Sequence, residues 1–405
     1  MLRWMPVTLV SLAMLVGAAV TASGAPVQAE RGAFHPSTSS PNPSSTKNVL
    51  RAVTVVSASN AWAAGDYTDD ATSASNTLIL HWDGTSWSQI ATPNPSSTEN
   101  RLFGVSAVSA GDAWAVGDYI DDATGATDTL ILHWDGTRWA KVSSPNPSPY
   151  NFLLSVSVHS ATDVWAVGNH ERSVGFGCGC RTLILHWDGR TWSKVKSPSP
   201  NPAGNFLLGV ASVSASDVWA AGYDHISQGD TLILHWDGTR WTKITSPNPS
   251  DDTRNLLFGV SATSATNAWA IGGYTYKNRS LILHWNGRHW SQVGSPNPSS
   301  FDNFLNGVSA ARSNDGWAVG YYRKNATHVY RTLVLHWNGS HWSRLKSPSP
   351  SSVKFATNAG YANELNGVSA QSKTNAWAIG DYVNDATGAT ETLILHWDGT
   401  SWSRT

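Results

Sequence analysis

A His-Trp dipeptide that returns at a nearly fixed interval is the feature that most limits how this chain can fold. It occurs seven times in 405 residues, and the tryptophans of successive pairs are 49 to 60 residues apart. The pairs are His81-Trp82, His133-Trp134, His186-Trp187, His235-Trp236, His284-Trp285, His336-Trp337 and His396-Trp397. A period near 50 residues is typical of solenoids, propellers and other repeat arrays. At three tryptophans per repeat, the repeats account for 21 of the 22 in the chain.

The second repeat contains four short segments suited to strands. Apolar residues dominate 102–108, 113–117 and 129–134, and Asp135-Gly136 is a strong hairpin signal before the last segment. No segment has sustained helical periodicity. Four antiparallel strands in each of seven repeats predict an all-β fold, a seven-bladed β-propeller of four-stranded antiparallel blades. The first and last repeats are as regular as the others, which favours a closed ring over a solenoid with capping repeats.

The repeat also resembles a known family. An aromatic residue three positions before a glycine, a strand before Asp-Gly or Asn-Gly, then a tryptophan and a proline exit make it similar to the kelch repeat of galactose-oxidase-like propellers. The resemblance covers residues 49–405 and implies a propeller of that kind. The second glycine of the kelch doublet is present only at Gly273. In the other repeats its position holds Asp66, Asp118, Asn169, Tyr223, Tyr321 and Asp381.

The N-terminal residues predict an export signal. Arg3 precedes an apolar run at 7–20 that is too short to span a bilayer, and a small-residue cleavage site follows. We therefore expect a signal peptide at 1–29, cut after Ala29, and a secreted extracellular protein with no membrane span in its mature chain. A Pro/Ser-rich linker at 30–47 would lead into a propeller at 48–405. The expected blades are about 48–95, 100–147, 151–200, 205–249, 255–298, 303–350 and 363–405.

The phase of the repeat predicts how the ring closes. The array opens on a first strand at 49–56 and ends on a fourth strand at 401–405, so every blade would be complete. Residues 41–48 resemble the segment 93–100, which links the first two repeats. We expect the last and first blades to share no strand and to meet through side chains alone.

Structural roles account for most of the repeated aromatic residues. Trp82 and Trp87 flank a tight turn and can pair across it, while residues such as Trp114 would fill the space between blades. Exposed platforms for sugar rings are the alternative. One histidine per blade places these side chains too far apart to share a metal ion. We expect their ring nitrogens to hydrogen-bond neighbouring backbone.

Composition and absent motifs limit the function. Lys plus Arg is 27 and Asp plus Glu is 28, a balance that argues against nucleic-acid binding. The sequence has no Gly-x-Ser-x-Gly elbow, Walker loop or His-Glu-x-x-His motif. We expect a monomeric, non-catalytic binding module that recognises an extracellular glycan or protein through its loops. The alternative is a propeller enzyme acting on carbohydrate, an oxidase or a hydrolase, because paired carboxylates occur in the loops.

The loop after the second strand of each repeat predicts the binding site, because it varies most. It would lie on the same face as the linkers, so the loops of blades 7, 1 and 2 would form one acidic arc. The expected ligand-binding residues are Tyr67, Asp69, Asp70, Tyr119, Asp121, Asp122, Tyr382 and Asp385. We expect no cofactor, and because clustered carboxylates suit hard cations, calcium is the one candidate that this arc suggests. A solvated, duplicated loop without a partner is the alternative.

Two cysteines, Cys178 and Cys180, occupy the corresponding loop of the third repeat. Their spacing allows a tight disulfide, which an oxidising compartment favours. A structural zinc site with His170 and His225 is a second interpretation, because two thiolates and two imidazoles satisfy tetrahedral zinc. Free thiols are the third.

Overall fold

The computed structural model describes residues 40–171, 179–224, 229–249, 254–274, 278–354 and 361–405. All regular secondary structure in these residues is β, in 28 strands, as the repeat pattern predicts. The described part of the chain contains no helix long and apolar enough to cross a membrane. The expected signal peptide at 1–29 and residues 30–39 of the expected linker lie outside the described residues.

The strands come in sets of four, one set for each repeat. The first three sets are β1 (Asn48–Ser57), β2 (Asn60–Thr68), β3 (Ser75–Trp82), β4 (Trp87–Ile90); β5 (Asn100–Ser109), β6 (Asp112–Ile120), β7 (Thr127–Trp134), β8 (Trp139–Lys141); and β9 (Tyr150–Ser160), β10 (Asp163–Glu171), β11 (Arg181–Trp187), β12 (Trp192–Lys194). The next two are β13 (Asn205–Ser214), β14 (Asp217–Asp224), β15 (Asp230–Trp236), β16 (Trp241–Ile244); and β17 (Asn255–Ser264), β18 (Asn267–Tyr274), β19 (Arg279–Trp285), β20 (Trp290–Gln292). The last two are β21 (Asn303–Arg312), β22 (Asp315–Arg323), β23 (Tyr330–Trp337), β24 (Trp342–Leu345); and β25 (Asn363–Ser372), β26 (Asn375–Val383), β27 (Thr390–Trp397), β28 (Trp402–Arg404).

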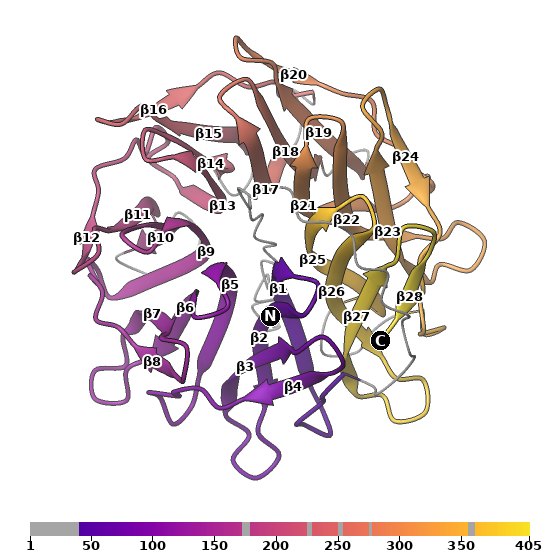
Figure 1. Cartoon of the computed structure of the whole chain (residues 1–405), viewed down its shortest axis with the longest axis horizontal. Helices are drawn as coiled ribbons and strands as arrows, with labels where there is room; N and C mark the ends of the chain where they lie inside the picture. The colour runs from indigo at the N-terminus through magenta and orange to yellow at the C-terminus, as the bar shows by residue number, and fades with distance from the viewer. Residues whose placement is uncertain (1–39, 172–178, 225–228, 250–253, 275–277, 355–360) are drawn as a thin grey trace, which may run out of the picture.

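Each set forms an antiparallel sheet in chain order, from β1 to β4 in the first set. The second and third sets join into one eight-stranded sheet through a single parallel pairing of Thr127 with Tyr150. The sheets stand around a common axis, with the first strand of each set innermost and the fourth outermost (Figure 1). The molecule is therefore a ring whose inner wall is built from β1, β5, β9, β13, β17, β21 and β25.

A glycine in each second strand is required where the first strand bulges. The register of β1 against β2 shifts between Leu50 and Ala52. A Cβ on Gly65 would lie 1.9 Å from the carbonyl oxygen of Val49, so no other residue fits there without moving the backbone. This glycine fixes the position of the next residue, Asp66, beside the inner strand.

Tryptophans fill the space between neighbouring sheets, which confirms their expected packing role. Trp62 is 1% exposed, and its ring lies 5.0 Å from that of Trp134 and 5.3 Å from that of Trp139 in the next set. Trp82 and Trp87 pair across their turn with ring centroids 5.9 Å apart. Every set repeats this arrangement, with buried second-strand residues Trp62, Trp114, Trp165, Trp219, Trp269, Trp317 and Trp377.

The histidine of each His-Trp pair has a structural partner, although not the expected one. His133 stacks on Trp114 at 4.2 Å, and its Nε2 lies 2.9 Å from Oδ1 of Asp112. The partner in every set is therefore a side chain at the start of the second strand, rather than backbone. These partners are Asn60, Asp112, Asp163, Asp217, Asn267, Asp315 and Asn375.

The ring closes through backbone as well as side chains, so the expectation of side chains alone was wrong. The backbone N–H of Thr390 donates to the carbonyl of Thr46 at 2.9 Å, and Lys47 forms a parallel bridge with Thr390. β1 and β28 nevertheless belong to different sheets, as expected. The reason is that the segment before β1 docks as the linker at the next junction does, where Ser75 N–H donates to the carbonyl of Thr98 at 2.9 Å.

A buried asparagine at the start of each first strand holds its linker, and its removal should destabilise the fold. Asn100 accepts a hydrogen bond from Ser96 N–H at 2.9 Å, and its amide donates to the carbonyls of Ser96 and Ser75. Asn100→Ala leaves these buried groups without a partner. We expect it to lower the free energy of unfolding by about 1–3 kcal/mol in denaturant titration. The control is Ser88→Ala on the exposed face of β4; equal midpoints for both variants would contradict the assignment.

Candidate functional site

The linkers between sets and the loops between second and third strands lie together on one face, here called the loop face. In the acidic loops of the first and second sets an aspartate shapes its own turn, and Asn384 takes this place in the last set. Asp69 Oδ1 accepts hydrogen bonds from the backbone N–H groups of Ala71 at 3.0 Å and Thr72 at 2.8 Å. These bonds lower the pKa of Asp69, with Thr72 contributing most. Asp121 is held by Ala123 and Thr124 in the same way.

The second aspartate of each acidic loop fastens the loop to a linker. Asp70 accepts hydrogen bonds from Ser44 Oγ at 2.8 Å and from Ser45 N–H at 2.9 Å. Asp122 and Asp385 bind their linker serines similarly, and hydrogen bonding lowers the pKa of each of the three aspartates. In the sixth set Asn325 takes this place, accepting from Ser299 Oγ at 2.8 Å and Ser300 N–H at 3.0 Å. This loop position therefore requires a hydrogen-bond acceptor but does not require a negative charge.

The expected tyrosines pack against their own sets rather than converging. Lys141 donates to the hydroxyl of Tyr119 at 2.7 Å and lies 4.0 Å from its ring centroid. Arg404 does the same for Tyr382, at 2.6 Å and 4.4 Å. Tyr67 is partly exposed at the end of β2. Among the described residues, no group of three or more His, Cys, Asp or Glu side chains is placed to hold a metal ion.

An acceptor role for Asp70 predicts a difference between two substitutions. Asp70→Asn keeps an acceptor, as Asn325 does, whereas Asp70→Ala removes it. We expect the amide of Ser45 to exchange with solvent about tenfold faster in the alanine variant and near the wild-type rate in the asparagine variant. Hydrogen–deuterium exchange with calcium and with chelator is the measurement. Equal acceleration in both variants, reproduced by chelator in the wild type, would instead indicate a bound cation.

The predicted cysteine site is only partly within the described residues. Cys180 is buried before β11, while Cys178 and His225 lie outside the described residues. His170 Nδ1 lies 3.2 Å from Ser148 Oγ, and its Nε2 lies 3.2 Å from Lys194 Nζ. The pairing of the two cysteines stays a prediction.

A group of buried charges on the inner strands was not identified from the sequence. It lies just below the loop face, on the arc formed by the seventh, first and second sets. We call it the inner charge cluster, and it consists of Arg51, Asp66, Arg101, Asp118, Glu364 and Asp381. All are buried except Arg101, whose side chain is 30% exposed. Glu364 and Asp381 are cross-strand neighbours, as are Arg101 and Asp118.

Hydrogen bonds connect the cluster within and between sets. Arg51 Nε donates to Asp66 Oδ1 at 3.0 Å, and Arg101 Nη2 donates to Asp118 Oδ2 at 2.7 Å. Two buried asparagines serve the other carboxyls: Asn306 Nδ2 donates to Glu364 Oε1 at 2.9 Å, and Asn366 Nδ2 donates to Asp381 Oδ1 at 3.2 Å. Asn366 also donates to the carbonyl of Leu50 at 2.8 Å, which ties the last set to the first.

The four carboxyl groups differ in how well they are compensated. Burial raises the pKa of Glu364 well above its usual value, with Asp381 adding to the rise. Burial raises the pKa of Asp381 to about 7, although Arg51 opposes the rise. For Asp66, burial acts upward too, but Arg51 and Lys47 outweigh it and hold the pKa below its usual value. Burial also raises the pKa of Asp118, although Arg101 opposes the rise. The cluster therefore pairs Asp66 well and leaves Glu364 and Asp381 short of positive charge.

Comparison with known proteins identifies the architecture. No protein-family model matches the chain, and no curated protein matches it. Among solved structures it is similar to YCF48 bound to a D1 peptide, at 14% identity and a TM-score of 0.51, over 88% of this chain and 93% of that one. YCF48 from Cyanidioschyzon merolae matches at 14% identity and a TM-score of 0.53, over 90% and 99% of the two chains. A GH74 xyloglucanase from Xanthomonas campestris matches at 12% and 0.52, over 84% of this chain and 53% of that one.

The chain is a β-propeller. Its sheets are four-stranded blades, and the inner charge cluster lies on the inner strands of adjacent blades.

Other blades of the propeller carry apolar side chains where this cluster has charged ones. The blades on the other side of the axis place apolar side chains on the same stretches of their inner strands. Leu154, Phe206, Leu208, Tyr223 and Leu256 of those blades belong to one buried cluster, which Phe103 of the second blade also joins. Taking a charge out of water costs several kcal/mol even when it is paired. Charged residues occupy inner-strand positions that are apolar in other blades of the same ring. Such a departure from the packing of the other blades points to a functional site.

One sequence signal for the cluster was visible. The residue after the second-strand glycine is acidic in exactly the first, second and last repeats, as Asp66, Asp118 and Asp381. These three aspartates are among the residues that replace the second glycine of the kelch doublet. The sequence alone does not reveal that these aspartates form a cluster, because Arg51 and Glu364 join them from neighbouring inner strands.

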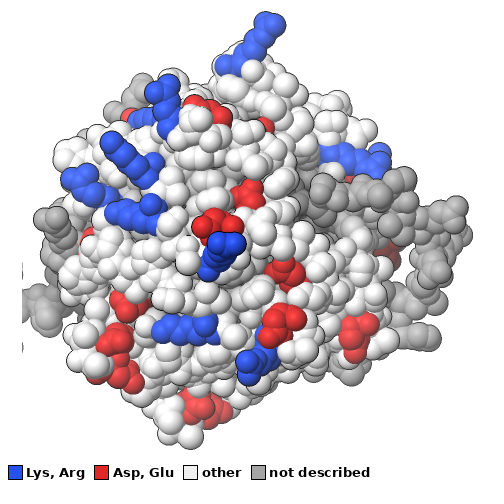
Figure 2. Space-filling view, turned by 60° about the vertical axis from the view of Figure 1, so that its left-hand side comes forward, with Lys and Arg blue, Asp and Glu red and all other residues white. Residues whose placement is uncertain are grey.

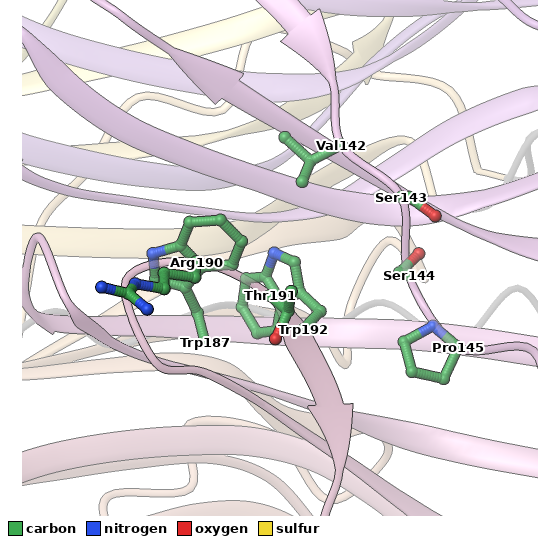
Figure 3. Close-up of a pocket in the computed structure, with 8 residues that line it drawn as sticks. All are labelled: Val142, Ser143, Ser144, Pro145, Trp187, Arg190, Thr191 and Trp192. Carbon is green, nitrogen blue, oxygen red and sulfur yellow. The ribbon is translucent and has the colours of Figure 1, made fainter.

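A second feature lies on the outer rim of the propeller, between the second and third blades. A hollow of about 390 Å³ is lined by Val142, Ser143, Ser144, Pro145, Trp187, Arg190, Thr191 and Trp192. The two indoles and Arg190 lie on one side and the 142–145 segment on the other (Figure 3). Trp192 is nearly buried, so the indole surface available to a ligand comes mainly from Trp187.

Proposed function

We propose that the protein is a secreted, seven-bladed β-propeller that acts as a non-catalytic binding module. In this proposal it holds a segment of extracellular polypeptide on the loop face, over the inner charge cluster. The observation that carries the proposal is the cluster itself, which sits under the loop face at positions where other blades carry apolar side chains. The arc of Tyr67, Asp69, Asp70, Tyr119, Asp121, Asp122, Tyr382 and Asp385 would border the bound segment.

The surface chemistry favours recognition through polar and charged groups. Among the described residues, Val108 is the only large apolar side chain that is strongly exposed, at 43%. On the side shown in Figure 2, charged residues are sparse and most of the surface is uncharged. A partner held through an apolar patch would need a larger exposed apolar area. Capture of a peptide by a propeller is supported by the similar structure described as YCF48 bound to a D1 peptide.

Two other functions have a specific observation behind them. A glycan could stack on Trp187 in the rim hollow, with Arg190 as a hydrogen-bond donor. A carbohydrate hydrolase needs two carboxyl groups of different pKa, and Glu364 and Asp381 are neighbouring carboxyls whose pKa values are raised. Binding at the rim, or turnover that is lost in both Glu364→Gln and Asp381→Asn, would favour these alternatives.

The test is to probe the full chain against immobilised extracellular peptides and polysaccharides, and then to map the bound ligand by hydrogen–deuterium exchange. The proposal expects a peptide ligand that protects the linkers at 41–47 and 93–99. The turns at 83–86 and 135–138, on the opposite face, serve as the internal control. Protection of those turns, or the absence of any peptide ligand, would overturn the proposal.

A further inference from the structure

Building on the proposed function, we infer that the arc between β22 and β6 binds a cationic side chain of that polypeptide, a lysine ammonium or an arginine guanidinium. The site consists of Glu364 and Asp381, flanked by Tyr321 and Tyr361 on one side and by Asp66 and Asp118 on the other. Charge balance, unpartnered acceptors and the flanking aromatic rings support this assignment independently.

The charge balance at the site favours a cation. The inner charge cluster contains four carboxyl groups and two guanidinium groups. The nearest partly exposed charges add one of each sign, because Lys47 lies 3.7 Å from Asp66 and Glu99 lies 2.8 Å from Arg101. Arg51 and Arg101 are already engaged by Asp66 and Asp118, so neither is free to receive an anion. An added positive charge would compensate Glu364 and Asp381.

Several buried acceptor oxygens at the site receive no hydrogen bond from the protein. Among the described residues, Asp118 Oδ1 and Asn366 Oδ1 are buried and accept no hydrogen bond, and Asp66 Oδ2 accepts none either, although Lys47 Nζ lies 3.7 Å from it. Each of these side chains is more than nine-tenths buried. Buried polar atoms in folded proteins nearly always have a partner, and an exception calls for a ligand, an ion or a water. An ammonium offers three donors and a guanidinium five, with no acceptor to be left unpaired.

Aromatic rings border the carboxyl pair on the loop face. The rings of Tyr321 and Tyr361 lie 4.1 Å apart, and Tyr330 lies 4.4 Å from Tyr361. The backbone N–H of Tyr361 also hydrogen-bonds Glu364, which places this tyrosine directly beside the carboxyl group. The faces of aromatic rings attract cations. Tyr361 is only partly buried, so it marks the side from which a ligand would enter.

The same blades already combine cations with tyrosine in this manner. Lys141 lies over Tyr119, Arg344 over Tyr322 at 4.7 Å, and Arg404 over Tyr382. In each pair the cation also donates to the tyrosine hydroxyl. Tyr321 and Tyr361 have no such cation within the described residues, and Arg51, the guanidinium that acts on the carboxyl groups beside them, is bonded to Asp66. A metal ion is a poorer fit, because the described residues include no group of three or more ligating side chains.

The test uses capped tetralysine and tetra-arginine peptides with the full chain, in calorimetry at pH 7.5 and low salt. The double variant Glu364→Gln/Asp381→Asn preserves side-chain shape and removes both carboxylates. We expect it to bind at least about tenfold more weakly than the wild type. Tyr361→Leu leaves the net charge unchanged and should also weaken binding. Asp230→Asn, on β15 across the ring, is the matched control and should bind as the wild type does.

Three results would overturn the inference. The first is equal affinity of the double variant and the wild type for tetralysine. The second is equal binding of a capped tetra-alanine peptide. The third is binding of spermine without binding of either peptide, which would assign the site to free polyamines. If a neutral peptide is captured on the loop face and is indifferent to Glu364→Gln/Asp381→Asn, the proposed function stands and this inference fails. If no library peptide binds the loop face, the proposed function fails and the tetralysine titration decides the inference by itself.

Discussion

Trp377→Ala should lower the free energy of unfolding by about 3–5 kcal/mol, the range for truncating a large aromatic residue in a core. Trp377 is 1% exposed in β26, and its ring lies 4.9 Å from Trp82 and 5.2 Å from Trp87. It therefore joins the last blade to the first. Removing the indole leaves a cavity at the junction between the last and first blades.

Comparing Trp377→Ala with Trp317→Ala in denaturant titration separates the loss of packing between two blades from the opening of the closing junction. Trp317 makes the same contacts with Trp397 and Trp402 at the junction between the sixth and last blades. We expect similar losses of stability in the two variants. Only Trp377→Ala should speed amide exchange at Thr390, whose N–H bonds Thr46 across the closing junction. A loss below about 1 kcal/mol would show that the junction does not depend on this packing.

Two isosteric substitutions in the inner charge cluster should change stability in opposite directions at pH 8. Asp66→Asn leaves Arg51 buried without its charge partner, and breaking a buried pair costs about 3–5 kcal/mol. Asp381→Asn removes a buried carboxylate that is short of positive charge. A rise in pKa from 3.8 to about 7 corresponds to about 4 kcal/mol at about 1.4 kcal/mol per unit, so this variant should be more stable by up to that amount.

The pH dependence of each difference follows from the direction of the pKa shift. The folded protein holds the proton of Asp381 more tightly than the unfolded chain does, so the wild type loses stability from about pH 4 to about pH 7. The advantage of Asp381→Asn should grow over that interval and level off above it. Asp66 has a lowered pKa, so its contribution is present above about pH 4 and disappears at lower pH.

These comparisons must be made against the wild type at each pH. Burial lowers the pKa of His396 to about 4, which gives the wild type a slope of the opposite sign between pH 4 and 6.5. Unfolding titrations of the three proteins at pH 4, 6 and 8 are the measurement. A stabilisation of Asp381→Asn that is the same at pH 4 and pH 8 would contradict a buried, titrating carboxyl group.

The sequence predicted the parts of the structure that are determined locally. The Asp-Gly turns, the alternation of apolar strands and the Trp82-Trp87 type of pairing all follow from neighbouring residues, and each is confirmed. The role of the inter-blade tryptophans was also correct, because a large aromatic residue in every repeat has to be buried somewhere. Kelch identity is not established, since no family model matches the chain.

What the sequence did not predict depends on contacts between repeats. Asp70 and its equivalents were assigned to a ligand because their loops are acidic, and the bonds to Ser44 and Ser45 could not be foreseen from loop composition. The inner charge cluster combines Arg51 with Asp381, residues that are 330 positions apart and meet only when the ring closes. Predicting it required the relative rotation of blades, which a repeat period does not supply.

The docking of residues 40–48 on the last blade bears on where new termini could be placed by circular permutation. Thr405 bonds the carbonyl of Ile394 as Val142 bonds that of Ile131, and Ser40 meets Thr392 as Ser144 meets Thr129. In the repeat, therefore, a single residue separates the position of Thr405 from that of Ser40, just as Ser143 separates Val142 from Ser144. The junction between the last and first blades is therefore equivalent to the junctions between other blades. A circular permutant that bridges it with one residue and opens at another linker should have the same native contacts as the natural chain.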